Sequence, residues 1–79
     1  MSNIDKYNEI FIKSFEIDGA MLGAELKYQS IPAWDSVGHM SMIAALEDVF
    51  NIMLETEDII DFSSYDKGKE ILSKYEVKF

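Results

Sequence analysis

The chain has 79 residues, of which 48% are apolar and 13% aromatic. A domain of this size has room for one modest core and no deep substrate cavity, and the composition is that of a globular protein rather than a disordered one. Fifteen acidic residues stand against seven Lys and no Arg, which gives a net charge of -8. The surface therefore repels nucleic acid and anionic lipids and attracts proteins with basic patches.

The sequence contains no recognisable targeting or membrane-spanning segment. Its first ten residues, MSNIDKYNEI, lack a basic stretch followed by an apolar one, and no apolar run approaches the roughly 18 residues that cross a bilayer. We therefore expect a cytoplasmic protein without membrane insertion. Cysteine is absent, so disulfides and thiolate metal sites are excluded, and any reactive thiol must come from outside the chain.

An amphipathic helix is predicted for residues 2–17. Ser2 or Asn3 can cap it, and Asp5 lies in its first turn, where the helix dipole favours an anion. The apolar residues recur at steps of three and four and share one face. They are Ile4, Tyr7, Ile10, Phe11 and Phe15.

A long loop is predicted for residues 16–35. Gly19 and Gly23 interrupt the helical pattern, and Pro32 prevents a helix from running through the residue before it. A loop of about 20 residues is long for a small domain, and such loops are usually functional or partly structured. We expect a short helical turn at residues 20–26.

The second helix is predicted to start at Asp35 or Ser36 and to end near Asn51. It has two apolar stripes. The stripe expected in the core consists of Met42, Ile43, Leu46 and Phe50. The other stripe consists of Val37, Met40 and Ala44. Either a small bundle surrounds the whole helix, or this second stripe is partly exposed and forms a binding surface.

Two shorter helices follow. Thr56, with Glu57 and Asp58 after it, opens a third helix, and Ser64 caps a fourth. The apolar contacts of the third helix are expected from Ile59, Ile60 and Phe62. The inner face of the fourth is expected to hold Tyr65, Gly68, Ile71, Leu72 and Tyr75, with Lys67, Lys69 and Lys74 pointing outward. Gly68 in mid-helix indicates a close helix contact or the approach of a ligand.

These elements predict an all-α protein with one domain, residues 1–79. The expected architecture is a four-helix bundle with a short third helix and a long loop between the first two helices.

Asp35, Ser36 and His39 are the residue types of a hydrolase triad, but their spacing does not suit that role. All three fall within one helical turn, no strand and nucleophile elbow precede the Ser, and no other element orients the His. As the only histidine, His39 cannot form a metal site alone, and we expect a surface or packing role for it. We therefore predict no catalytic residue and no metal site.

Two acidic pairs, Glu47-Asp48 and Glu57-Asp58, have no metal-binding pattern. Neighbouring residues on a helix point in different directions, and neither pair matches a calcium loop. A solvated helix face is the default interpretation of both pairs. Glu47 and Asp48 share a helix with Ser36, however, and could recruit a basic partner.

Ser36 has a property beyond capping. Asp35 or Ser36 can cap the second helix, but a cap accounts for one of these residues and not for both. The N–H groups and positive dipole of a helix N-terminus would also stabilise a phosphate esterified to a hydroxyl there. Ser36 is therefore a candidate site for a phosphate-linked modification.

The stretch WDSVGHMSMIAALEDVFNI resembles the acyl carrier protein family around its D-S-L modification motif. The resemblance continues through TEDIIDFSSY into the last helix and covers nearly the whole chain, including its length, its acidity and its long first loop. The D-S-hydrophobic motif alone is weakly specific, and the setting makes it strong.

The resemblance implies a carrier protein, which is itself a substrate and not an enzyme. In that family a phosphopantetheinyl transferase moves 4'-phosphopantetheine from coenzyme A, with magnesium, onto the motif serine, here Ser36. The thiol of the arm then carries an acyl or aminoacyl group as a thioester to acyl-loading and acyl-using enzymes. A monomer is expected, because the docking surface must stay free for successive partners.

The resemblance also implies roles for neighbouring residues. Asp35 would orient the transferase and its metal ion. The partner surface would consist of Val37, Met40 and Ala44 beside Glu47 and Asp48. The bundle interior, where a small or apolar acyl group could shelter, would be lined by Met42, Ile43, Leu46, Phe50, Phe62 and Leu72.

Several positions depart from carriers of general fatty acid synthesis. Gly38, His39 and Ser41 stand where acids are usual, Val37 replaces the motif leucine, and Trp34 replaces a small residue. These departures favour a stand-alone carrier of a specialised pathway, for a secondary metabolite or a surface polysaccharide. The alternative is an unmodified acidic helical module that binds a partner through the second apolar stripe.

Overall fold

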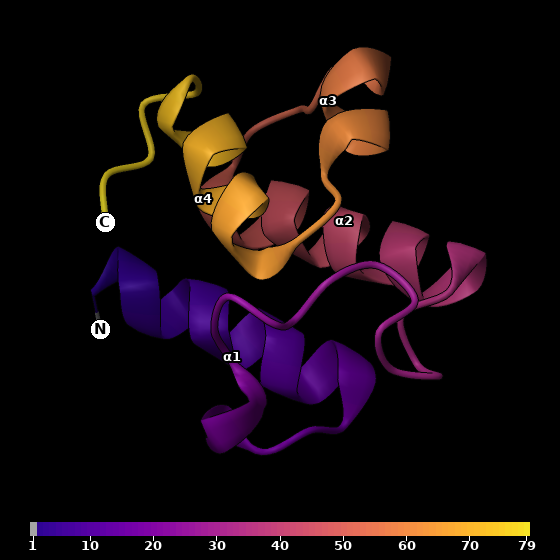
Figure 1. Cartoon of the computed structure of the whole chain (residues 1–79). Coiled ribbons are helices and arrows are strands. Elements are labelled where there is room, and N and C mark those ends of the chain that lie inside the picture. Colours follow the sequence, from indigo (N-terminus) through magenta and orange to yellow (C-terminus); the bar gives the residue numbers. More distant parts are fainter. Residues whose placement is uncertain (1) are drawn as a thin grey trace.

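Four α-helices and one short turn make up the fold in the computed structural model, which describes residues 2–79 (Figure 1). The helices are α1 (Asn3–Phe15), α2 (Ser36–Phe50), α3 (Thr56–Asp61) and α4 (Tyr65–Ser73), and the 3-10 turn η1 (Gly19–Met21) follows α1. No strand forms within residues 2–79, where the one β-type pairing is an isolated bridge between Lys27 and Ser64. The predicted all-α class and the order of the helices are confirmed.

Local capping sets most of the helix ends. Ser2 caps α1 by accepting a hydrogen bond from the N–H of Asp5, and Ser64 caps α4 through the N–H of Lys67. Glu16 and Asn51 adopt the left-handed conformation at the ends of α1 and α2, which stops each helix. The predicted bounds therefore hold to within about two residues.

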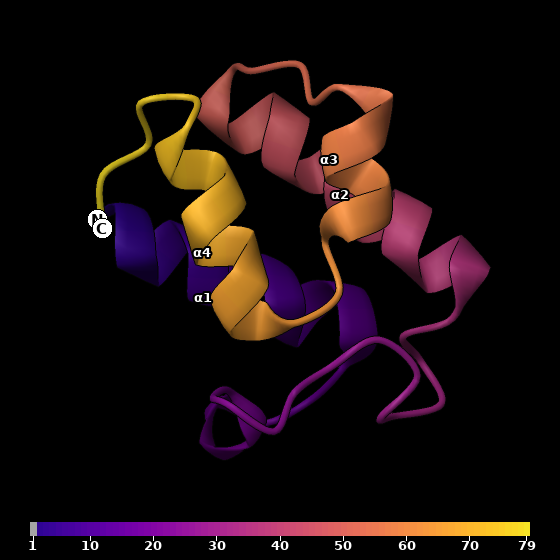
Figure 2. The same cartoon turned by 45° about the horizontal axis from the view of Figure 1, so that its top comes forward.

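α1 and α2 pack against each other. α4 is seen in front of part of α2 in Figure 1 and in front of part of α1 in Figure 2, and α3 stands away from the two chain ends. The two chain ends lie side by side, where the Asn3 side chain donates a hydrogen bond to the Lys78 carbonyl at 2.9 Å. The radius of gyration is 11.3 Å, close to the value of about 12 Å expected for a compact chain of this length.

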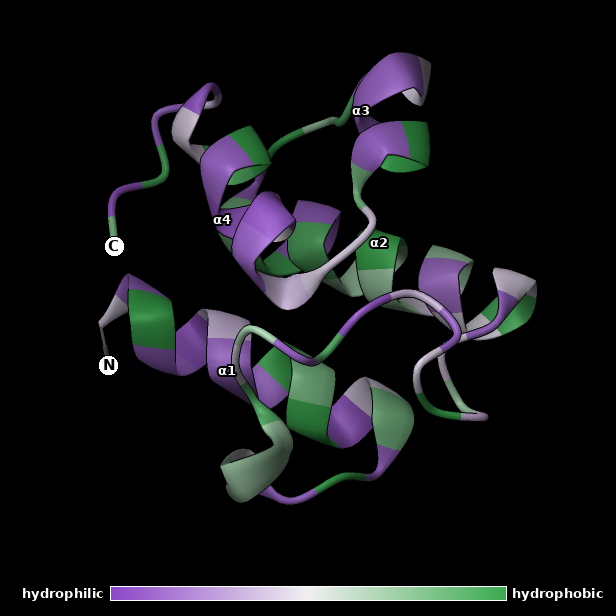
Figure 3. Ribbon diagram, in the orientation of Figure 1, coloured by the Kyte–Doolittle hydropathy of each residue, from purple (hydrophilic) through white to green (hydrophobic). Residues whose placement is uncertain are grey.

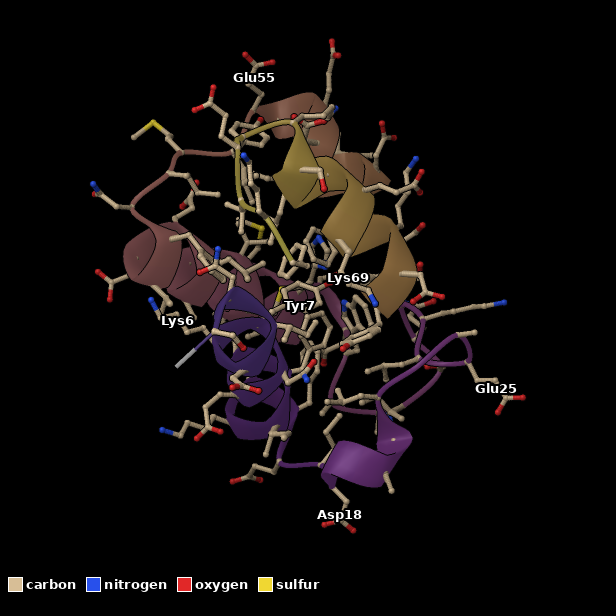
Figure 4. The ribbon with its side chains drawn as sticks, turned by 90° about the vertical axis from the view of Figure 1, so that its left-hand side faces the viewer. Lys6, Tyr7, Asp18, Glu25, Glu55 and Lys69 are labelled. Atoms are coloured by element: carbon tan, nitrogen blue, oxygen red, sulfur yellow. The ribbon has the colours of Figure 1, made fainter. Side chains whose placement is uncertain are left out.

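Aromatic rings fill the centre between α1, α4 and the long loop. Phe11 contacts the rings of Tyr7, Phe15, Trp34 and Tyr65 at centroid distances of 4.8 to 5.7 Å. Figure 4 shows Tyr7 directed inward, whereas Asp18, Glu25 and Glu55 point away from the core. The Tyr7 hydroxyl donates to the Tyr65 carbonyl at 2.6 Å, and burial raises the pKa of Tyr7.

The stripe of α2 predicted to face the core does so, except at its last residue. Met42, Ile43 and Leu46 are buried, and Phe50 is partly exposed. Hydrophobic residues recur along α2, whereas the visible face of α4 is mostly hydrophilic (Figure 3). α2 therefore has more apolar surface than the core uses.

Gly68 is required by a close helix contact. A β-carbon at this position would overlap the ring of Phe62 and the hydroxyl of Tyr7. Of the two explanations that the sequence allowed, the structure shows the packing contact.

The long loop is more tightly held than its sequence suggests. Its helical turn covers Gly19–Met21 and not residues 20–26, and residues 26–28 are bonded to residues 63–65, where α4 begins. The N–H of Tyr28 donates to the Ser63 carbonyl, and the N–H of Tyr65 donates to the Leu26 carbonyl, each at 2.9 Å. These bonds place Tyr28 beside the start of α2.

α3 departs from the prediction at two side chains. Ile60, expected to make apolar contacts, is 74% exposed. Asp58, expected on a solvated face, is only 7% exposed and accepts hydrogen bonds from the Lys74 ammonium and the Tyr75 hydroxyl. Six residues form too short a helix for a long apolar stripe. The bonds from Lys74 and Tyr75 to Asp58 therefore add to the packing of Ile59 against the core in holding α3.

Candidate functional site

The acid and the hydroxyl of the D-S motif have different environments. Asp35 is the cap of α2, and its Oδ1 accepts the N–H of Gly38 at 2.8 Å. Ser36 is the first residue of the helix, and its side chain is exposed. The cap is therefore Asp35, and the Ser36 hydroxyl is available for another role.

Gly38 allows the loop to close over this helix end. A β-carbon at Gly38 would overlap the carbonyl oxygen of Ala33. The chain therefore approaches the first turn of α2 more closely than any other residue type would permit.

Trp34 and His39 form a buried pair below Ser36. Trp34 is 0% exposed, and its Nε1–H donates to His39 Nδ1 at 2.9 Å. Because Nδ1 accepts this bond, a neutral His39 carries its proton on Nε2, which donates to the Ile59 carbonyl at 2.9 Å. This pair ties the long loop and α2 to α3.

This pair shows what role His39 has in the fold and whether Trp34 is exposed to a partner. His39 is a packing residue, and both of its ring nitrogens are occupied by Trp34 and Ile59. It therefore cannot accept the proton of Ser36, as a triad would require. Trp34 is inaccessible, so it does not itself present an unusual surface to a partner.

Tyr28 is a site residue that sequence reasoning missed. Its hydroxyl lies 3.1 Å from Ser36 Oγ, within hydrogen-bond distance. Its ring meets the ring of His39 edge-on, with the centroids 5.6 Å apart. No local pattern predicts this contact, because it depends on the bonds that pin the long loop to the residues before α4.

An open groove begins at Ser36 and runs between α2 and α3. Its volume is about 370 Å³, and apolar atoms form most of its surface. The lining residues are Tyr28, Ser36, His39, Met40, Ile59, Ile60, Phe62 and Ser63. Ser36 thus stands at one edge of a mainly apolar trough.

The second apolar stripe of α2 is exposed. Val37 is 76% and Met40 52% exposed, and Ala44 is also exposed. Ile60 adds to this apolar surface across the groove from Met40. Of the two arrangements left open by the sequence, the structure has the exposed one.

The two acids expected to attract partners differ in their surroundings. Asp48 is exposed. Glu47 is half-buried, and its carboxylate accepts the N–H of Leu54 at 2.9 Å. Glu47 therefore stabilises the connection between α2 and α3, in addition to any role toward a partner.

Other features of the described residues bear on the choice of function. Among residues 2–79, no group of three or more His, Asp or Glu side chains is arranged to hold a metal ion. In the same part of the chain, no helix has the length and apolarity needed to cross a membrane. Comparison with protein-family models, curated proteins and solved structures gives no match to this chain.

Proposed function

We propose that this protein is an acyl carrier protein that bears 4'-phosphopantetheine on Ser36. The observation that carries the proposal is the division of roles at the start of α2. Asp35 alone caps the helix, which leaves an exposed serine hydroxyl beside an acid, at the end of an apolar groove. The four-helix arrangement and the D-S-V motif also agree with the resemblance to that family.

The residues around the groove suit such an arm. The arm is a flexible chain of methylene and amide groups, and the groove offers an apolar floor with hydroxyl groups at Tyr28 and Ser63. When bound, the group supplies the thiol that the cysteine-free chain lacks, for an acyl or aminoacyl thioester. Ser36 would be the attachment point. Its oxygen would become the ester oxygen as the pyrophosphate bond of coenzyme A breaks, adenosine 3',5'-bisphosphate leaves, and the hydroxyl proton passes to the transferase.

The partner surface is proposed on the outer side of α2 and on α3. Val37, Met40 and Ala44 give it an apolar centre, and Ile60 extends that centre across the groove. Asp48 lies farther along α2, and the chain as a whole has a charge of -8. An apolar patch on an acidic protein suits enzymes whose docking sites combine apolar and basic residues.

The cargo is proposed to belong to a specialised pathway. The bundle interior is filled by large side chains, with Met42, Leu46 and Leu72 each fully buried. An attached group would therefore lie in the groove of about 370 Å³ outside this interior, and that limited volume favours a short acyl, hydroxyacyl or aminoacyl group. The protein acts as a cytoplasmic monomer in this proposal, so that successive enzymes reach the same surface.

The test is covalent loading of the purified protein. Incubation with coenzyme A, magnesium and a broad-specificity phosphopantetheinyl transferase is expected to raise the intact mass by one phosphopantetheine. Ser36→Ala is expected to abolish the gain, and Ser41→Ala, which removes another exposed hydroxyl on α2, is expected to retain it. No mass gain with several transferases would contradict the proposal.

A second candidate is an unmodified acidic module that binds a partner through the same apolar surface. The exposure of Val37, Met40 and Ile60 favours it. In that case Ser36→Ala leaves function intact, whereas Met40→Glu destroys it. The carrier requires both residues, so the Ser36→Ala variant separates the two.

A further inference from the structure

Tyr28 is held in place from several directions beside Ser36. Its N–H donates to the Ser63 carbonyl, and the next N–H, that of Gln29, donates to the Trp34 carbonyl, each at 2.9 Å. Its ring packs edge-on against Trp34 and His39. A side chain fixed at both backbone and ring gives its hydroxyl a defined position, 3.1 Å from Ser36 Oγ.

The helix end offers less to a phosphate than the sequence suggests. The Asp35 carboxylate already occupies the N–H of Gly38 and places a negative charge at the positive end of α2. The Asp35 carboxylate therefore repels a phosphate attached to Ser36. A neutral hydrogen-bond donor nearby would stabilise that phosphate without adding negative charge. The Tyr28 phenol is such a donor.

We propose that Tyr28 is a positioning residue for the group attached to Ser36, an inference that rests on the proposed carrier function. A phosphodiester at Ser36 Oγ adds oxygen atoms directly beside the atom that Tyr28 now contacts. The Tyr28 hydroxyl donates to one of these oxygens, and a hydrogen bond to a charged acceptor is stronger than the one to a neutral hydroxyl. Tyr28 thereby directs the start of the arm along the groove.

The phosphorus-31 NMR spectrum of the loaded protein tests this role. In Tyr28→Phe the ring and its packing remain and only the hydroxyl is lost. The phosphorus resonance is expected to shift and to narrow, because the docked arm becomes less populated by roughly ten- to hundredfold, the factor that one hydrogen bond to a charged group supplies. Tyr65→Phe, which loses a hydroxyl bonded to Asn8 and does not line the groove, is expected to leave the resonance unchanged.

The outcomes separate the two proposals. An unchanged phosphorus shift and line width in loaded Tyr28→Phe would overturn the positioning role and leave the carrier function standing. Equal changes in Tyr28→Phe and Tyr65→Phe would also overturn it, because the effect would then be general. If the wild-type protein gains no mass with any transferase, both proposals fail.

Discussion

Asp35 and Ser36 are adjacent, but replacing Asp35 is expected to lower stability, whereas replacing Ser36 is expected to remove the modification site. Asp35 caps the helix by accepting a hydrogen bond from the N–H of Gly38, whereas the Ser36 hydroxyl lies within hydrogen-bond distance of the Tyr28 hydroxyl. Removing Asp35 is expected to cost about 1 kcal/mol of stability. Removing the exposed Ser36 hydroxyl leaves the cap in place, so a loss of loading in Ser36→Ala reflects chemistry rather than unfolding.

Gly38→Ala is expected to destabilise the protein by about 1–3 kcal/mol, the usual cost of forcing an extra carbon into a filled space. The added β-carbon overlaps the Ala33 carbonyl, and backbone cannot move aside as a flexible side chain can. Urea denaturation followed by circular dichroism measures the change. Gly19→Ala is the control, since its β-carbon would meet Ile12 at an ordinary 3.8 Å, and equal losses in both variants would refute this account of Gly38.

Some of these residue roles are accessible from sequence and others are not. The cap at the start of α2 follows from residue type and position, so it could be predicted to within one residue. The hydrogen bond between Trp34 and His39 joins the loop to α2. It could not be predicted, because it depends on the close contact between the Ala33 carbonyl and Gly38. The Tyr28 contact depends on a bridge to residues far along the chain.

α3 is held by polar contacts on two sides as well as by the packing of Ile59 against the core. His39 donates to the Ile59 carbonyl from one side, and Lys74 and Tyr75 reach Asp58 from the other. These hydrogen bonds lower the pKa of Asp58 below its ordinary value of 3.8, with the Lys74 bond as the larger cause. These contacts hold α3 in place, and two of its residues, Ile59 and Ile60, line the groove that also contains Ser36.

Asp58→Asn is expected to lower stability at neutral pH and to lose this effect in acid. A carboxyl whose pKa is depressed by folding contributes stability above its unfolded-state pKa, and that stability is lost as pH falls through the folded-state value. The difference in urea midpoint between wild type and Asp58→Asn should therefore be constant near neutrality and shrink below pH 3.8.

Asp48→Asn serves as the control for this pH dependence. Asp48 is an exposed acid on α2, so its replacement changes the net charge equally at a site on another helix than the Asp58–Lys74 pair. A midpoint difference for Asp58→Asn that stays the same from neutral to acid pH would contradict the role given to the ion pair.

Helices could be predicted from sequence where the apolar residues repeat at helical spacing over several turns. α1 and α2 extend for 13 and 15 residues, and their apolar spacing and caps place them closely. α3 has six residues, fewer than two turns, so no stripe distinguishes inward from outward positions. Hydrophobicity alone therefore assigned Ile60 to the interior and Asp58 to the surface, whereas Ile60 is exposed and Asp58 is buried.

The protein as a whole combines a net charge of -8 with an exposed apolar patch on α2 and α3, formed by Val37, Met40, Ala44 and Ile60. Met40→Glu places a charge in that patch and is expected to reduce kcat/KM for loading by a transferase by roughly tenfold, as for a typical interface residue. Met53→Glu is the control, because Met53 is 83% exposed and does not line the groove. Similar losses in both variants would show that charge alone, and not the patch, affects docking.

The most direct test of the carrier assignment is to locate the added group on the loaded protein. Proteolysis followed by fragment mass spectrometry is expected to find one phosphopantetheine, attached to Ser36. Its attachment at any other residue, or a wild-type protein that stays unmodified after incubation with several transferases, would contradict the account.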